Sequence, residues 1–213
     1  LWKAFHDGHD VHRATASEIF DITPLEVTSD QRRYAKVINF GLIYGMSAFG
    51  VASNLGISRT DAKNYIDRYF ERYPGVARYM DETRQLAREQ GYVETVFGRR
   101  LWLPEINSPN GPRRQAAERA AINAPMQGTA ADIIKIAMIR VDERLRRENL
   151  RSRLILQVHD ELLVETAEDE KETVMRILSE EMHHAASLKV ELEIDMHDGK
   201  NWFEAKYARI LLQ

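Results

Sequence analysis

The segment Leu-Ile-Leu-Gln-Val-His-Asp-Glu-Leu-Leu-Val-Glu, residues 154–165, decides the fold class of this chain. Its aliphatic and β-branched residues predict two strands, 154–158 and 161–165, joined by a tight turn. A helix over 168–184 and a strand over 190–194 are expected to follow. The C-terminal part is therefore predicted to be an α+β unit of antiparallel strands and packing helices.

The sequence before this hairpin is mostly helical in pattern. Capping boxes, prolines at first helical positions and glycines at helix ends predict where the helices begin and end. The expected helices are a short one from Thr23, then 30–44, 58–72, 74–91, 113–122 and 127–147, the last two separated at Pro125. A hairpin is expected over 93–96 and 101–103. The loop 106–112 predicts the boundary between a helical domain, 1–108, and the α+β domain, 109–213.

The composition excludes several classes of protein. With 213 residues, 44% of them hydrophobic, the chain can bury a core, which excludes a disordered protein. No apolar run approaches the roughly 18 residues that span a bilayer, so we expect no membrane partner. The absence of cysteine excludes disulfides, thiolate zinc sites and a cysteine nucleophile, and it suits a cytoplasmic protein.

Four side chains along the expected helix 30–44 could bind a nucleotide. Arg32, Lys36, Phe40 and Tyr44 lie four residues apart, so each is displaced by only about 40° around the helix axis from the previous one. The cations occupy the N-terminal half, where the helix dipole also favours anions, and the aromatic rings occupy the other half. This order matches a polyphosphate followed by a base. The spacing alone favours the alternative, a solvated basic turn followed by two core aromatics.

The turn His159-Asp160-Glu161 is the second candidate site. A two-residue hairpin turn favours Asn-Gly or Asp-Gly, so a His-Asp turn costs stability, and such costs tend to persist at functional sites. Hard divalent cations such as Mg²⁺ prefer carboxylate oxygens. An exposed acidic turn is the alternative interpretation. Two carboxylates are also too few to hold two ions, so a third must come from elsewhere.

A third polar row is formed by Arg119, Asn123 and Gln127, again four residues apart. Guanidinium and amide groups hydrogen-bond phosphates, sugars and base edges. The alternative is a row of surface and helix-capping side chains.

The three candidates together resemble one known family. RRYAKVINFGLIYG (residues 32–45) closely resembles motif B of the family A DNA polymerases, and QVHDE (157–161) resembles their motif C. ERAAINAPMQGTAADIIK (118–135) is similar to the palm segment between those motifs, and DVHRATA (10–16) to the stretch before motif B. The resemblance implies a DNA-directed DNA polymerase of replication and repair, with a helical fingers subdomain followed by part of the palm.

The resemblance implies a role for each residue of the helical stripe. Arg32 and Lys36 would bind the triphosphate of a dNTP, and Lys36 would also protonate the leaving pyrophosphate. Phe40 would stack on the sugar and base, and Tyr44 would guard the templating position. His12 would approach the phosphates.

The remaining roles concern DNA and metal. The resemblance implies that four residues contact primer and template: Arg119, Asn123, Gln127 and His159. Asp160 would ligate Mg²⁺, with Glu161 assisting nearby. The implied partners are primer-template DNA and dNTPs.

One motif of the family is missing from this sequence. The first metal-binding aspartate of these polymerases belongs to motif A, DYSxxExR, which precedes motif B, and no such string occurs here. We therefore expect a fragment that needs an upstream remainder, the palm with motif A and the thumb, and that does not polymerise alone. A non-catalytic nucleic-acid-binding module derived from a polymerase is the alternative. Residues 207–213 carry no prediction.

Overall fold

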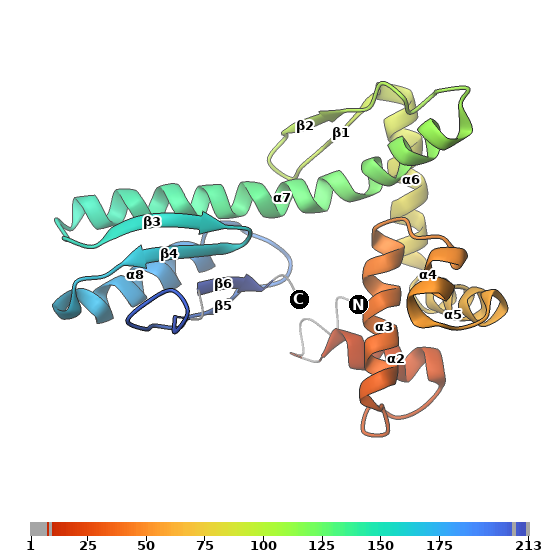
Figure 1. Cartoon of the computed structure of the whole chain (residues 1–213). Helices are drawn as coiled ribbons and strands as arrows, with labels where there is room; N and C mark the ends of the chain where they lie inside the picture. The colour runs from red at the N-terminus through yellow and green to blue at the C-terminus, as the bar shows by residue number, and fades with distance from the viewer. Residues whose placement is uncertain (1–7, 9, 206–207, 212–213) are drawn as a thin grey trace. The chain divides into compact units, whose positions relative to one another are not determined.

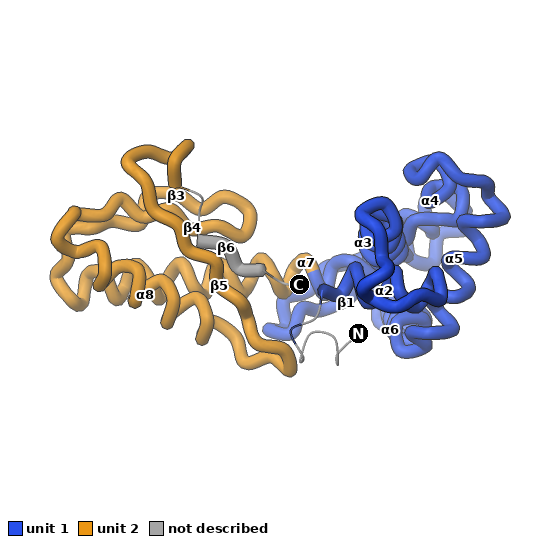
Figure 2. The backbone as a smooth tube through the Cα atoms, turned by 90° about the horizontal axis from the view of Figure 1, so that it is seen from below, with its two compact units in different colours: residues 1–126 blue, residues 127–213 orange. Residues whose placement is uncertain are grey.

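The computed structural model describes residues 8, 10–205 and 208–211. The chain forms two compact units, residues 1–126 and 127–213, shown in blue and orange in Figure 2. The first unit is helical apart from one hairpin, and the second combines helices with an antiparallel sheet (Figure 1). The α+β class expected from the sequence is confirmed.

The described part of the first unit contains five helices, a two-stranded hairpin and the start of a sixth helix. Its elements are α2 (Val11–Phe20), α3 (Ser29–Ile43), α4 (Ala48–Leu55), α5 (Arg59–Arg72), α6 (Pro74–Gln90), β1 (Tyr92–Glu94), β2 (Arg100–Trp102) and the first part of α7 (Gly111–Arg147). Apolar residues of α2 to α5, among them Ile38 and Tyr69, form its main core.

The sequence predicts the caps of α3 and α5, whereas α2, capped by Asp10, and α4, capped by Ser47, were not expected. The Thr28 hydroxyl accepts from the Gln31 amide while the Gln31 side chain accepts from the Thr28 amide, which closes a capping box at the start of α3. Ser58 caps α5 through the amide of Asp61. The short helix expected from Thr23 is wrong, because the carboxylate of Glu26 satisfies the backbone amide of Thr23 within a single turn that does not continue.

The second unit is built on the C-terminal part of α7. Its further elements are β3 (Arg153–Val158), β4 (Glu161–Glu165), the 3₁₀ turn η1 (Glu168–Glu170), α8 (Lys171–His183), β5 (Glu193–Asp195) and β6 (Ala208–Leu211). The sheet order is β3-β4-β6-β5, and every neighbouring pair is antiparallel. Apolar side chains of α7, α8 and β4 form the core.

Two strands of this sheet differ from the sequence expectation. The strand expected over 190–194 is β5, displaced to Glu193–Asp195. The strand β6 was not foreseen, and it pairs Arg209 opposite both Glu161 and Asp195. The four residues of β6 include an arginine and are too few to show a periodicity that distinguishes a strand from a loop. The strand forms because it pairs with β4 and β5, which are not adjacent to each other in the chain.

Helix α7 runs through Pro125 without interruption, so the expected division into two helices is wrong. A proline inside a helix removes one hydrogen bond and costs about 3 kcal/mol. Buried residues on both sides, Ala121 and Ile122 before it and Ile133 and Ile134 after it, each stabilise the helix by packing. Burial of a large aliphatic side chain contributes about 1.5–3 kcal/mol, so packing outweighs the cost of the proline.

The two compact units divide inside α7, after Met126, whereas we expected the domain boundary at residue 108. The reason is that the first turns of α7 pack with the hairpin. Ala117 and Ala121 share a core cluster with Val93 of β1 and Leu103. The loop 106–112 therefore lies within the first unit.

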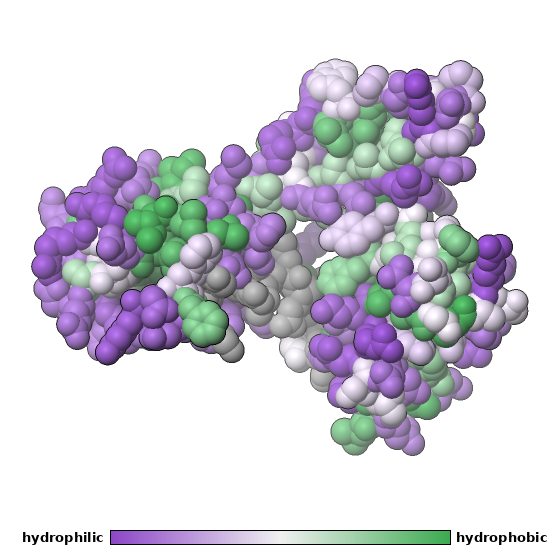
Figure 3. Space-filling view, in the orientation of Figure 1, coloured by the Kyte–Doolittle hydropathy of each residue, from purple (hydrophilic) through white to green (hydrophobic). Residues whose placement is uncertain are grey.

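Large apolar side chains also remain on the surface of the second unit. Figure 3 shows a hydrophobic region over the strands of this unit, where Ile155 and Leu156 of β3 are 54% and 38% exposed. None of the helices in the described part of the chain is long and apolar enough to cross a membrane.

A carboxylate joins the start of β3 to the segment after β4. Glu170 accepts from the amides of Arg151 and Ser152 at 3.0 and 2.9 Å and from the Ser152 hydroxyl at 2.6 Å. These bonds, led by the Arg151 amide, lower the pKa of Glu170 to about 2. The stabilisation is therefore present above the ordinary carboxyl pKa and is lost as pH falls toward 2.

We expect Glu170→Gln to remove part of the acid sensitivity of folding. Wild type should lose stability between about pH 4.5 and pH 2, and the variant should lose less over that window because it has no carboxylate to protonate. Urea unfolding midpoints at pH 5 and pH 3 measure this difference. Glu168→Gln, in the same turn but exposed, is the control. Equal acid sensitivity in wild type and Glu170→Gln would show that this carboxylate does not stabilise the fold.

Candidate active site

The stripe of α3 lies on the surface of the first unit. Phe40 and Tyr44 are 42% and 43% exposed, and their rings stack with centroids 6.4 Å apart and planes inclined by 18°. Lys36 is exposed one turn before Phe40. Large aromatic rings in solvent are not core residues, so the core interpretation of this stripe does not hold.

Arg32 has a partner that the sequence did not reveal. Its Nε lies 2.6 Å from Oδ2 of Asp10, while Oδ1 of Asp10 caps α2 by accepting from the amides of His12 and Arg13. Burial opposes ionisation of Asp10, but the hydrogen bonds from Arg32 and from these amides outweigh it and lower the pKa of the carboxyl. The guanidinium is thereby tied to the start of α2.

His12 completes this face. Its ring centroid lies 5.4 Å from that of Phe40, and its Nδ1 lies 3.1 Å from Nδ2 of Asn39. Burial, together with the positive charges of Arg32 and Lys36, lowers the pKa of the His12 imidazole despite the nearby carboxylate of Asp10. Cations, an imidazole and two aromatic rings thus lie on one surface. This surface, made of Arg32, Lys36, Phe40, Tyr44 and His12, is called the α3 face below.

Arg119 lies next to the end of this face. A Cβ built on Gly45, the residue after Tyr44, would lie 2.6 Å from Cγ of Arg119. Gly45 also has φ of +70°, a conformation that residues with a side chain rarely adopt. The glycine therefore both ends α3 and leaves room for the arginine.

We expect Gly45→Ala to destabilise the first unit by about 1–2 kcal/mol, because the left-handed conformation is unfavourable for alanine. It should also displace Arg119. Urea unfolding measures the change in the free energy of unfolding. Gly75→Ala is the matched control, because Gly75 is helical and a Cβ there meets only the end of Arg78 at 3.9 Å. If the Gly45 variant is as stable as the Gly75 variant, the fold does not require glycine at position 45.

The other two members of the polar row lie further along α7. Asn123 is half-buried, and its Oδ1 has no hydrogen-bond partner among the described residues. A buried acceptor without a partner costs about 1–3 kcal/mol. Gln127 is exposed at the start of the second unit.

The acidic corner, residues 159–161, forms the turn between β3 and β4 in the second unit. His159 adopts φ of +53°, and its carbonyl accepts from Nε2 of Gln157 at 2.6 Å. Asp160 is exposed, whereas Glu161 is 8% exposed and lies opposite Arg209 of β6 in the strand register. The strained turn expected from a His-Asp sequence is present.

The acidic corner fits a divalent cation in part. Its carboxylate oxygens are the donors that Mg²⁺ prefers. The described residues contain no group of three or more histidine, aspartate or glutamate side chains that could hold a metal ion. Asp160 and Glu161 therefore offer part of a ligand set.

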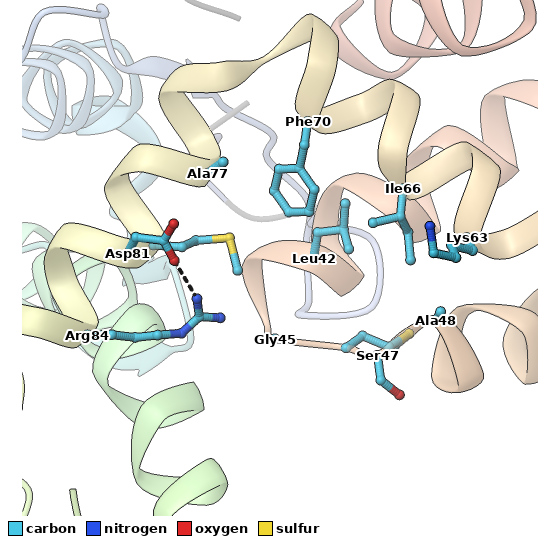
Figure 4. Close-up of a pocket in the computed structure, with 12 residues that line it drawn as sticks. Leu42, Gly45, Ser47, Ala48, Lys63, Ile66, Phe70, Ala77, Asp81 and Arg84 are labelled. Carbon is cyan, nitrogen blue, oxygen red and sulfur yellow. Dashed lines mark hydrogen bonds and ion pairs between the residues drawn. The ribbon is translucent and has the colours of Figure 1, made fainter. Parts of the chain in front are cut away.

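A separate pocket of about 430 Å³ is lined by the segment that links α3 to α4 and by side chains of α5 and α6. Figure 4 shows Leu42, Ile66 and Phe70 around it, with the ion pair between Asp81 and Arg84, 2.9 Å long, at one side. None of the residues predicted from sequence to bind nucleotide, DNA or metal lines this pocket.

Two residues that contact the α3 face, Asp10 and Asn39, were not predicted from the sequence as site residues. Asp10 stands just before the first turn of α2, where an N-cap is expected, and this was its only signal. Asn39 is an amide among inward-facing residues such as Ala35, Ile38 and Leu42, and it is 4% exposed. A polar residue on a buried helix face is a signal of a specific hydrogen-bonding role.

Comparison with known proteins identifies the family. The model of DNA polymerase family A matches residues 1–204. The chain is 58% identical over 205 residues to DNA polymerase I of Pseudomonas aeruginosa and 49% identical over 206 residues to DNA polymerase I of Bacillus caldotenax. These matches cover 96% and 97% of this chain but only 22% and 24% of the relatives.

A solved structure is similar over almost the same span. It is the POL domain of Pol1 from M. smegmatis in complex with DNA primer-template and dNTP, with a TM-score of 0.92 and 47% identity. The match covers 96% of this chain and 36% of that one. The resemblance found in motifs B and C therefore extends along the chain, which belongs to DNA polymerase family A.

Proposed function

We propose that this chain supplies the fingers and part of the palm of a DNA-directed DNA polymerase that acts in replication and repair. The observation that carries the proposal is the arrangement of the α3 face, where Lys36 and His12 lie beside the exposed rings of Phe40 and Tyr44. The chain also belongs to DNA polymerase family A. A mycobacterial relative that carries primer-template and dNTP supports the same substrates here. The proposed location is the cytoplasm, with the DNA.

In this proposal the dNTP lies along the α3 face. Its triphosphate meets Arg32, Lys36 and His12 near the N-terminal half of α3, where the helix dipole adds favourable potential. Phe40 stacks on the sugar and base, and each stacked base contributes about 1–3 kcal/mol. Tyr44 guards the templating position.

The reaction is attack of the primer 3′-hydroxyl on the α-phosphate with release of pyrophosphate. Lys36 acts as a general acid and donates a proton to the leaving pyrophosphate. A general acid must lie close to the departing oxygen that it protonates. A contact surface for primer and template is assigned to four side chains, Arg119, Asn123, Gln127 and His159.

The acidic corner would hold Mg²⁺ through Asp160, with Glu161 assisting nearby. Bound ions would supply charge neutralisation of the phosphates and a lower pKa of the primer hydroxyl, as in other two-metal sites. Because the described residues contain no third carboxylate at this corner, we infer that a further ligand joins them from outside this set. Residues 1–213 alone should therefore not extend a primer.

A hybrid polymerase tests this function. The chain replaces the segment that it matches in the Pseudomonas aeruginosa DNA polymerase I, to which it is 58% identical. The hybrid should extend a primed template with Mg²⁺ and dNTPs, and residues 1–213 alone should not. A hybrid that binds primer-template without extending it would favour a non-catalytic binding module. Extension by residues 1–213 alone would refute the incomplete ligand set.

A further inference from the structure

A buried polar cluster lies directly behind the α3 face. It joins Thr15 of α2, which is fully buried, to Asn39 of α3, which is 4% exposed. Asn39 also contacts His12, which lies one turn before Thr15 on α2. None of the roles described above uses Thr15 or Asn39. Buried polar groups of this kind fix the orientation of the groups that they bond.

The protons of the cluster can be assigned from its geometry. The Thr15 hydroxyl carries one proton, and Val11 O lies 2.8 Å from its oxygen and accepts it, while the Tyr73 hydroxyl, which also hydrogen-bonds Thr15, can donate to that oxygen. The same oxygen lies 3.1 Å from Nδ2 and 3.3 Å from Oδ1 of Asn39. With its proton donated to Val11, the hydroxyl acts as an acceptor toward Asn39, so Nδ2 is the atom that bonds it.

The same amide nitrogen fixes the state of His12. A carboxamide nitrogen donates and does not accept, so its second proton is directed at Nδ1 of His12, 3.1 Å away. Nδ1 must then be an acceptor without a proton of its own. The imidazole is neutral, and its single proton sits on Nε2.

We propose that Asn39 is a positioning residue that holds His12 as the neutral tautomer with its proton on Nε2, so that this N–H donates to a nucleotide phosphate. The inference rests on the proposed function, in which His12 approaches the triphosphate. Arg32 and Lys36 of α3 and Asp10 before α2 are the charged groups that act on His12. The two cations supply the positive charge of the face, and His12 adds an oriented neutral donor.

The tautomer can be measured by nitrogen NMR on residues 1–213 with labelled histidine. The chain has seven histidines, and a His12→Gln variant identifies the signals of His12. We expect a protonated Nε2 and an unprotonated Nδ1 near pH 7. A proton on Nδ1 of the wild-type protein would overturn the inference.

Two variants separate positioning from simple packing. Asn39→Asp replaces the donor by an acceptor of the same shape, so His12 should carry a proton on Nδ1 and its pKa should rise. Thr15→Val removes the hydroxyl that orients the amide, so the pure Nε2–H state should be lost. Thr83→Val, a buried threonine of α6, is the matched control and should leave the tautomer unchanged. An unchanged His12 state in the folded Thr15→Val or Asn39→Asp protein would contradict the inference, and if neither folds, the wild-type tautomer decides it.

Addition of dNTP distinguishes this inference from the proposed function. In wild type the Nε2–H signal should shift on binding, and Thr15→Val should weaken binding by about tenfold, the effect of one oriented hydrogen bond to a charged group. The expected tautomer without any response to dNTP would leave the positioning inference intact and contradict the nucleotide site. The opposite tautomer with a normal response would refute only the positioning inference.

Discussion

The hybrid polymerase with Asp160→Asn should extend a primer about 10³-fold more slowly than the unaltered hybrid. Asp160 is exposed at the tip of the acidic corner, and its replacement by an amide removes one anionic oxygen from the proposed metal ligands. Stabilisation of transition-state charge by a bound metal is worth several kcal/mol, and about 4 kcal/mol corresponds to the expected change in rate. Single-turnover extension at saturating dNTP measures it.

The control for this variant is Glu165→Gln, which neutralises an exposed acid at the other end of β4. Its extension rate should equal that of the unaltered hybrid. The affinity for primer-template should be retained in Asp160→Asn, because the variant removes negative charge from a surface proposed to face DNA. A rate within a few-fold of wild type for Asp160→Asn would remove the metal role of this residue.

The second large effect is expected for Lys36→Ala. Lys36 is exposed on the α3 face, and among the described residues no carboxylate forms an ion pair with it. It is therefore available to bind phosphate and to donate a proton. General acid catalysis contributes typically 10²–10⁴-fold, so the extension rate should fall by about 10²–10³-fold and nucleotide affinity should fall with it.

Pre-steady-state extension over a range of dNTP concentrations separates the two parts of this effect. Lys63→Ala is the matched control, because Lys63 is an exposed lysine of the same unit that pairs with Asp67 on α5. A Lys36 variant that loses affinity but keeps its maximal rate would assign Lys36 to phosphate binding only. An effect no larger than that of Lys63→Ala would contradict both roles.

The parts of the fold that local chemistry determines could be predicted from the sequence. The capping box of Thr28 and Gln31 fixes the start of α3, and Gly45 with φ of +70° follows its end. The pairing of β3 with β4 follows from their aliphatic sequences and the turn between them. These features depend on residues that lie within a few positions of one another.

The features that sequence reasoning missed depend on distant residues. Arg32 pairs with Asp10, 22 positions away, and Asn39 bonds Thr15, 24 positions away. Helix α7 continues through Pro125 because packing on both sides outweighs a local cost. The place of β6 between β4 and β5 depends on two strands that are not adjacent in the chain. No local pattern reports any of these contacts.

The central claim is that the acidic corner holds the metal ion of the proposed polymerase. Iron(II) can replace Mg²⁺ in the hybrid polymerase bound to primer-template and dNTP, and the radicals that it generates with peroxide cut the polypeptide close to the ion. We predict cuts at residues 157–161, mapped by mass spectrometry, and none there in Asp160→Asn. Uncut residues 157–161 in the unaltered hybrid would contradict the account.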